Sequence, residues 1–202
     1  MTRLLAFLLA LSLSGPAHPD PVTDLLFAEG QLATLPAGQE IRYTHQRTGR
    51  EVADFRPVTA GSIVLTRGEG GLALTITSDG RSQSLDRPSD GGNPVLMVFL
   101  ESVTRSMAAQ TGGSPFYIRN RIKDALRAGG ELSEDSEAQK RTITLRPFLK
   151  DPNHDRMGGF AELTLRFILS DTVPGRFLSL QAETPAATGY SETITLVQEG
   201  DE

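Results

Sequence analysis

The sequence contains no cysteine, no tryptophan and only three histidines in 202 residues. The lack of cysteine excludes disulfides, thiol catalysis, thiolate metal sites and a lipid-modified cysteine after a signal peptide. The lack of tryptophan argues against a site that stacks on carbohydrate rings. Because His18, His45 and His154 stand far apart and no Gly-x-Ser-x-Gly motif is present, the sequence shows no recognisable catalytic group and implies no cofactor.

Long hydrophobic runs are also scarce. The one prominent run, Leu4–Ser14, follows the basic Arg3 and precedes the small residues Gly15-Pro16-Ala17. It is shorter than the roughly 20 residues that a membrane-spanning helix needs. The pattern predicts a cleavable signal peptide over residues 1–17 and an exported protein, periplasmic or secreted, with no transmembrane segment in the mature chain.

An excess of basic residues is absent as well. The whole chain has a formal net charge of −5, and the mature chain would carry 19 basic and 25 acidic residues, a net charge of −6. A nucleic-acid-binding domain is usually basic, so we expect no nucleic-acid partner. Residues 18–202 suit one domain that is large enough to bury a core without disulfides.

Alternating apolar and polar residues predict an antiparallel sheet of about seven or eight strands. The expected strands span residues 39–46, 62–67, 72–78, 81–85, 141–148, 161–170, 176–184 and 191–197. Asp79-Gly80 is a strong hairpin signal, because both residue types tolerate positive φ. Runs of strands on both sides of one helical block indicate an α+β fold, in which a curved sheet carries the helices on one face.

The helical block covers residues 93–128 and consists of two helices with the same kind of start. Asn93-Pro94 and Ser114-Pro115 each supply a capping side chain followed by a proline at the first helical position. Because their connection is short, we expect the two helices to pack as an antiparallel hairpin. A third, short helix is expected after Asp20-Pro21, and the acidic segment 131–139 is expected to be a solvated loop.

The first helix of the block has one strongly apolar face. Its members are Leu96, Phe99, Leu100, Val103 and Met107. With the sheet, this face would either fill the core or line a groove that holds a lipid, an acyl chain or the hydrophobic segment of a partner. The two alternatives stay open at the level of sequence.

A basic stripe marks the second helix of the block. Arg119, Lys123 and Arg127 follow each other at intervals of four residues and therefore share one side of the helix. Such a stripe would suit an anionic partner, including another protein of the cell envelope. The alternative is a solvated face whose cations pair with the acidic residues 131–137.

A partial calcium-loop pattern follows the predicted strand 141–148. Its oxygen ligands would be Asp151, Asn153, Asp155 and Glu162, at positions 1, 3, 5 and 12. The position that normally holds glycine is Arg156, and the neighbouring segments resemble strands, whereas this motif is bounded by helices. The alternative is a hairpin loop built from ordinary turn residues.

Two stretches of the chain resemble exported alphaproteobacterial proteins of unassigned function. They are LPAGQEIRYTHQRTG (residues 35–49) and GNPVLMVFLE (residues 92–101) with its continuation GGSPFYIRNR (residues 112–121). The predicted layout is also similar to the half-barrels of periplasmic lipoprotein carriers. Neither resemblance brings functional residues with it, since a shared fold does not fix a function.

These observations support three hypotheses of different classes. The first is a non-enzymatic periplasmic protein that binds an apolar ligand or maintains the envelope. The second is an interaction protein that acts through its basic helix. The third is an unrecognised carboxylate- or calcium-dependent enzyme that would use carboxylates such as Asp151, Asp155 or Glu162.

Overall fold

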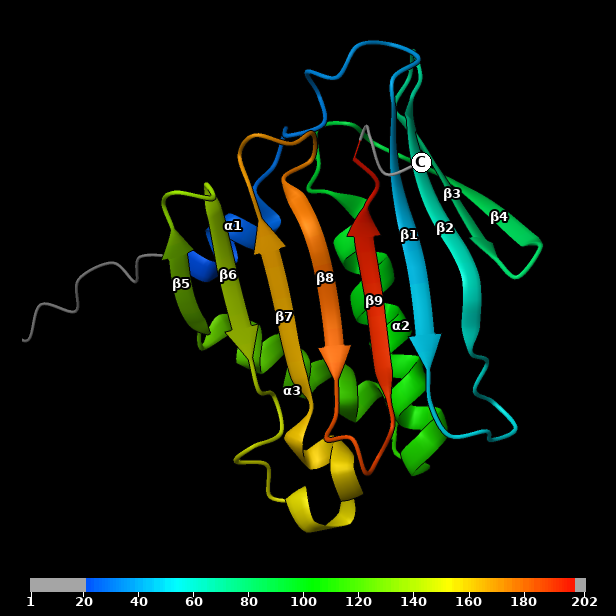
Figure 1. The fold of residues 1–202 in the computed structure, drawn as a ribbon, viewed down its shortest axis with the longest axis vertical. Helices are drawn as coiled ribbons and strands as arrows, with labels where there is room; N and C mark the ends of the chain where they lie inside the picture. The colour runs from blue at the N-terminus through cyan, green and yellow to red at the C-terminus, as the bar shows by residue number, and fades with distance from the viewer. Residues whose placement is uncertain (1–20, 199–202) are drawn as a thin grey trace, which may run out of the picture.

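Nine strands form one antiparallel sheet in the computed structural model, which describes residues 21–198. The predicted signal peptide and His18 lie outside the described residues. The strands are β1 (Glu40–Thr48), β2 (Val58–Arg67), β3 (Leu72–Ser78), β4 (Arg81–Arg87), β5 (Glu131–Asp135), β6 (Lys140–Leu145), β7 (Thr164–Leu169), β8 (Phe177–Glu183) and β9 (Ser191–Leu196). Their order in the sheet is β4-β3-β2-β1-β9-β8-β7-β6-β5, so the β1–β9 pair joins two meanders (Figure 1).

Three α-helices and two short 3-10 helices accompany the sheet within residues 21–198. They are α1 (Pro21–Phe27), α2 (Pro94–Thr111), α3 (Pro115–Arg127), η1 (His154–Arg156) and η2 (Gly158–Glu162). The predicted caps are confirmed, because the Asn93 side chain accepts a hydrogen bond from the Val95 N–H at 3.1 Å. Ser114 does the same for Tyr117 at the start of α3. Gly112 ends α2 with a φ of 68°, a conformation that favours glycine.

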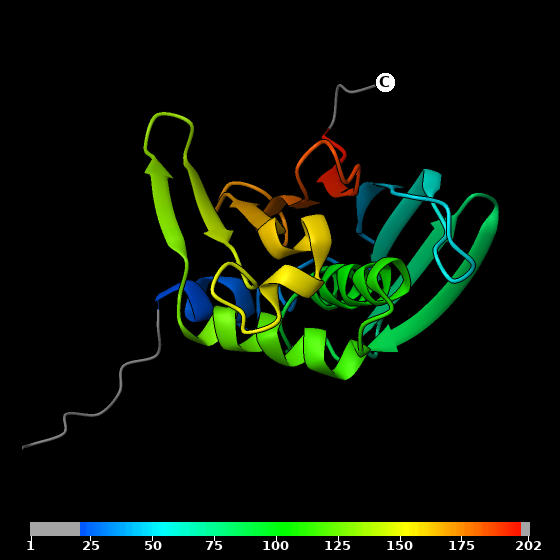
Figure 2. The same ribbon diagram turned by 90° about the horizontal axis from the view of Figure 1, so that it is seen from below.

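The helices lie on one face of the sheet, which curves around α2 (Figure 2). This layout agrees with the predicted α+β class and the curved antiparallel sheet. The two consecutive helices and their tight connection also agree with the prediction. However, α2 runs along the strands and α3 turns across them toward β5 and β6, so the two do not lie side by side in opposite directions (Figures 1 and 2).

One strand of the sheet was not expected. Residues 131–135 form β5, which pairs with β6 at the edge of the sheet, so the prediction of a loop is wrong for these residues and holds only for the exposed turn 136–139. All five residues of β5 are exposed. A strand with solvent on both faces needs no apolar alternation, and its charged residues discourage pairing with another chain. The hydrophobic pattern therefore carries no sign of this strand.

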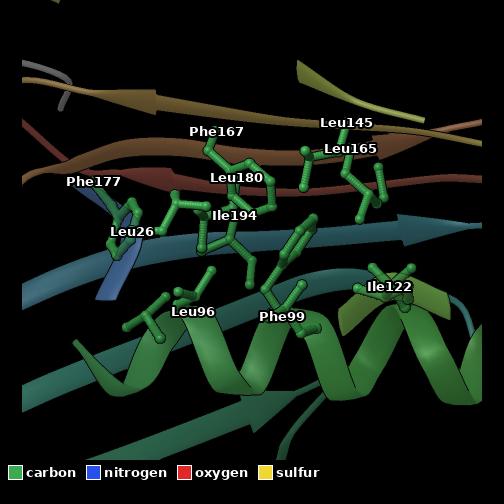
Figure 3. Packing of buried hydrophobic residues seen from close by; sticks show 14 of the residues in the cluster. Leu26, Leu96, Phe99, Ile122, Leu145, Leu165, Phe167, Phe177, Leu180 and Ile194 are labelled. Carbon is green, nitrogen blue, oxygen red and sulfur yellow. The ribbon is translucent and has the colours of Figure 1, made fainter. Parts of the chain in front are cut away.

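A single hydrophobic core fills the space between the sheet and the helices. Side chains from three strands, Phe167, Leu180 and Ile194, point toward Leu96 and Phe99 of α2 (Figure 3). These side chains are almost completely buried. Within residues 21–198, no helix combines the length and the apolar composition that a bilayer span requires.

Candidate functional site

The five apolar residues that were candidates for a ligand groove lie in the core. Leu96, Phe99, Val103 and Met107 are at most 1% exposed, and Leu100 is 9% exposed. Together they fill the concavity of the sheet, which was one of the two alternatives for this face. A groove open to a ligand must therefore be sought beside this face and not on it.

An open groove of about 580 Å³ lies on another side of α2, between this helix and the strands β3 and β4. We call it the α2–β4 groove. Its apolar lining includes Leu74 and Ile76 from β3, Leu85 from β4, and Pro94, Met97 and Val98 from α2. All seven residues of β4 are exposed. The hairpin of β3 and β4 therefore extends the concave sheet beyond the part that α2 covers, and it leaves one wall of the groove in solvent.

Two large apolar side chains in this groove face water. Met97 is 59% exposed and Leu85 is 36% exposed. Single exposed apolar residues are common on protein surfaces, but several that line one concave site are typical of ligand grooves and interaction sites. Neither residue was singled out from the sequence, because Met97 lies off the apolar face of its helix and β4 is mostly polar.

Charged side chains in the groove are mainly basic. Among the described residues, Arg47, Arg87 and Arg105 line it together with one acid, Glu101. Burial alone would raise the pKa of Glu101, but hydrogen bonds from Arg105 and Arg119, at 2.7 and 2.9 Å, lower it below its usual range. Glu101 therefore stays ionised near neutral pH, and these four lining residues together carry a net charge of +2.

A buried polar cluster lies next to the groove. His45, which also lines the groove, donates from Nε2 to Oε1 of Glu192 at 2.8 Å, and the Tyr190 hydroxyl donates to Oε2 at 2.8 Å. All three side chains are almost fully buried. Burial and the negative charge of Glu192 raise the pKa of Tyr190 well above its usual range. The three residues lock β1 to β9, and Nδ1 of His45 has no hydrogen-bond partner among the described residues.

The four calcium candidates do not converge. Asp151 is buried, whereas the side chains of Asp155 and Glu162 are exposed. The Asp151 carboxylate accepts hydrogen bonds from Tyr117, from Arg121 at 2.6 Å and from the Asn153 N–H at 2.7 Å. In the part of the chain that the structure describes, no three His, Asp or Glu side chains are grouped to hold a metal ion. Asp151 instead ties α3 to the loop before η1.

The Asp151 carboxylate and its hydrogen-bond donors should make the free energy of unfolding depend on pH in the acidic range. Burial alone would raise the pKa of Asp151, but the hydrogen bonds from Asn153, Tyr117 and Arg121 outweigh burial and lower it. A carboxyl whose folded-state pKa is depressed stabilises the fold above its unfolded pKa of about 3.9 and loses this contribution as pH falls. We expect Asp151→Asn to lower the free energy of unfolding at pH 7 by about 1–3 kcal/mol.

Urea unfolding at several pH values between about 7 and 3 would test this expectation. Asp151→Asn should flatten the fall in stability between about pH 5 and 3. Asp155→Asn is the matched control, since the Asp155 side chain is fully exposed, and it should follow the wild type. Equal slopes for the wild type and Asp151→Asn would show that Asp151 is not a source of the acid sensitivity.

The basic stripe of α3 is partly engaged in ion pairs. Arg119 binds Glu101 of α2, Arg127 lies 3.5 Å from Asp124 on its own helix, and Lys123 is exposed. These partners differ from the acidic residues 131–137 of the solvated-face alternative, among which Glu131 pairs with Arg146. An anionic partner for the stripe stays a prediction.

Comparison of the chain with protein-family models and with curated proteins gave no match. The resemblance to exported alphaproteobacterial proteins and to lipoprotein carriers therefore stays a prediction. Any function has to be argued from the α2–β4 groove and its surroundings.

Proposed function

We propose that this chain is an exported, non-enzymatic binding protein that holds a lipid-like ligand with an acyl chain in the α2–β4 groove. The observation that carries the proposal is a groove of about 580 Å³ in which Met97 and Leu85 are exposed. This volume is in the range of known small-molecule sites, about 300–1,000 Å³. The predicted signal peptide, which lies outside the described residues, would place this binding in the periplasm or outside the cell.

The nature of the walls favours an elongated apolar ligand. We call the apolar side chains of the groove, which come from two strands and one helix, its apolar strip. Met97 and Leu85 leave this strip open to solvent. Covering this strip would remove apolar surface from water, which is favourable by roughly 25 cal/mol per Å². A hydrophobic helix of a partner protein would compete for the same strip, and the experiment below separates the two occupants.

The fluorescence of N-phenyl-1-naphthylamine, a neutral apolar dye, tests whether the groove binds a small ligand. We expect the wild type to bind the dye, and we expect Met97→Glu and Leu85→Glu each to weaken binding about tenfold or more, because each places a charge in the apolar wall. Leu132→Glu is the matched control. Leu132 is 39% exposed and lies on β5, at the opposite edge of the sheet.

The control variant should bind the dye as the wild type does. Equal binding by all three variants would remove the groove as the site. An absence of dye binding to the wild type, together with no lipid adduct in native mass spectrometry of protein purified from its own envelope, would overturn the proposal and favour a protein partner. Circular dichroism of each variant checks that it is folded.

A further inference from the structure

The direction of α2 relative to the sheet is fixed by contacts at the end of β1. Arg47 donates to the Ser102 hydroxyl at 2.7 Å, and Arg50 donates to the backbone carbonyl of Gln110 at 2.9 Å. Later residues of α2 thus lie beside later residues of β1. Because neighbouring strands are antiparallel, β3 also runs in the direction of β1. The helix wall, α2, and the strand wall, β3, of the α2–β4 groove therefore run in the same direction.

From Leu85 and Met97 onward along this direction, the groove changes from apolar to polar. In the sheet, Leu74 lies opposite Leu85, and Ser78 comes four residues later. On the helix, Met97 precedes the polar residues of the groove by one or more turns. At about 3.3 Å per strand residue and 1.5 Å per helical residue, the two walls become polar over a similar distance.

The polar end holds hydrogen-bond donors with a net positive charge. Arg47 is fixed there by hydrogen bonds to the Arg56 carbonyl and to Ser102. Arg105 uses its Nε for Glu101, and its side chain is 77% exposed, so its terminal N–H groups face solvent. The charges of Arg47, Arg105 and Glu101 at this end sum to +1.

We infer that the ligand is a single-chain amphiphile with an anionic head group, and that its head group lies at the Arg47–Arg105 end while its chain runs between Met97 and Leu85. This inference rests on the proposed function. A carboxylate and a phosphate monoester share the required chemistry, since both accept charge-assisted hydrogen bonds from guanidinium groups. An anionic head group would find few hydrogen-bond donors in the apolar middle of the groove.

The other end of the groove is poorer in donors. Arg87 is the cation there, and it lies opposite the buried Leu72 in the sheet. Pro94 begins α2 at this end and has no backbone N–H to donate. Arg87 therefore provides a matched control for Arg105, because both line the groove and the same substitution can be made at each end.

Displacement of the neutral dye by twelve-carbon amphiphiles, below their micelle concentrations, tests the inference. Dodecanoate or dodecyl phosphate should displace the dye at about tenfold lower concentration than dodecanol, and dodecyltrimethylammonium should be the weakest. Arg105→Gln should reduce this preference about fivefold or more, whereas Arg87→Gln should change it less than twofold. Glu101→Gln, which removes the one acid among the described groove residues, should increase it.

The outcomes separate this inference from the proposed function. Equal displacement by all four amphiphiles would overturn the anionic head group and leave a groove for apolar ligands. Loss of preference in Arg87→Gln but not in Arg105→Gln would overturn the orientation. A preference for dodecanoate would indicate a fatty acid, and one for dodecyl phosphate a phospholipid-type head group. Absence of dye binding is a failure of the proposed function itself.

Discussion

Phe99→Ala should lower the free energy of unfolding by about 3–5 kcal/mol and leave the affinity of the groove for a neutral dye almost unchanged. Phe99 is completely buried, and its ring lies edge to face with Phe167 of β7, with ring centroids 5.9 Å apart. Truncation to alanine removes this aromatic contact and leaves a cavity in the centre of the core. Urea unfolding would measure the loss.

A matched substitution on the same helix should behave in the opposite way. Met97→Ala removes an exposed side chain and should change stability by no more than about 0.5 kcal/mol, but it should weaken dye binding. This pair of variants separates the face of α2 that fills the core from the side that lines the groove. A stable Phe99→Ala protein that no longer binds the dye would reverse the assignment.

The sequence periodicity of α2 predicts its apolar face but not what that face meets. Leu96, Phe99 and Val103 share one side of the helix in any packing, whether the space beyond them is filled or empty. The answer depends on Phe167, Leu180 and Ile194, which come from strands far away in the chain. The α2–β4 groove was missed for the same reason, since it arises where the β3–β4 hairpin extends past the helices.

The sequence predicted helix caps and the hairpin turn correctly, because these features depend on residues that are neighbours in the chain. Asn93 and Ser114 cap their helices as predicted, and Asp79 and Gly80 turn the β3–β4 hairpin with φ values of 45° and 82°. The crossing of α3 relative to α2 was not predictable from their short connection. A three-residue link allows several crossing directions, and contacts with the sheet decide among them.

The calcium pattern shows how a correct spacing can have another cause. Asp151 and Asn153 stand at suitable positions in the sequence, but Asp151 binds Tyr117 and Arg121, which lie 34 and 30 residues away. Their ring hydroxyl and guanidinium take the place that a cation would occupy. Since long-range partners are not visible in a twelve-residue motif, the pattern alone could not distinguish a metal ligand from an ion pair.

Glu192→Ala should destabilise the protein by about 3–5 kcal/mol, because it removes the shared acceptor of a buried cluster. The Glu192 side chain is fully buried on β9 and accepts from both His45 and Tyr190. Without it, the buried His45 imidazole loses its only partner among the described residues and the Tyr190 hydroxyl keeps only its hydrogen bond with Ser106, and each buried group left unsatisfied costs about 1–3 kcal/mol. Urea unfolding at pH 7 would measure the effect.

Glu183→Ala is the appropriate control for this variant. Glu183 lies at the end of the neighbouring strand β8 and forms an exposed ion pair with Arg166 at 3.2 Å, so its removal should cost no more than about 1 kcal/mol. Similar losses for the two variants would mean that the buried cluster contributes no more than a surface pair.

A variant that replaces the whole cluster gives the sharper test of its purpose. His45→Leu, Glu192→Leu and Tyr190→Phe together remove every buried polar group of the trio, and such apolar replacements are often neutral or stabilising. We expect most of the stability lost in Glu192→Ala to return. His45 also lines the groove. If the triple variant regains stability but its affinity for the ligand changes, the cluster serves binding. If it regains stability and its affinity is unchanged, the role of the cluster is limited to joining β1 and β9.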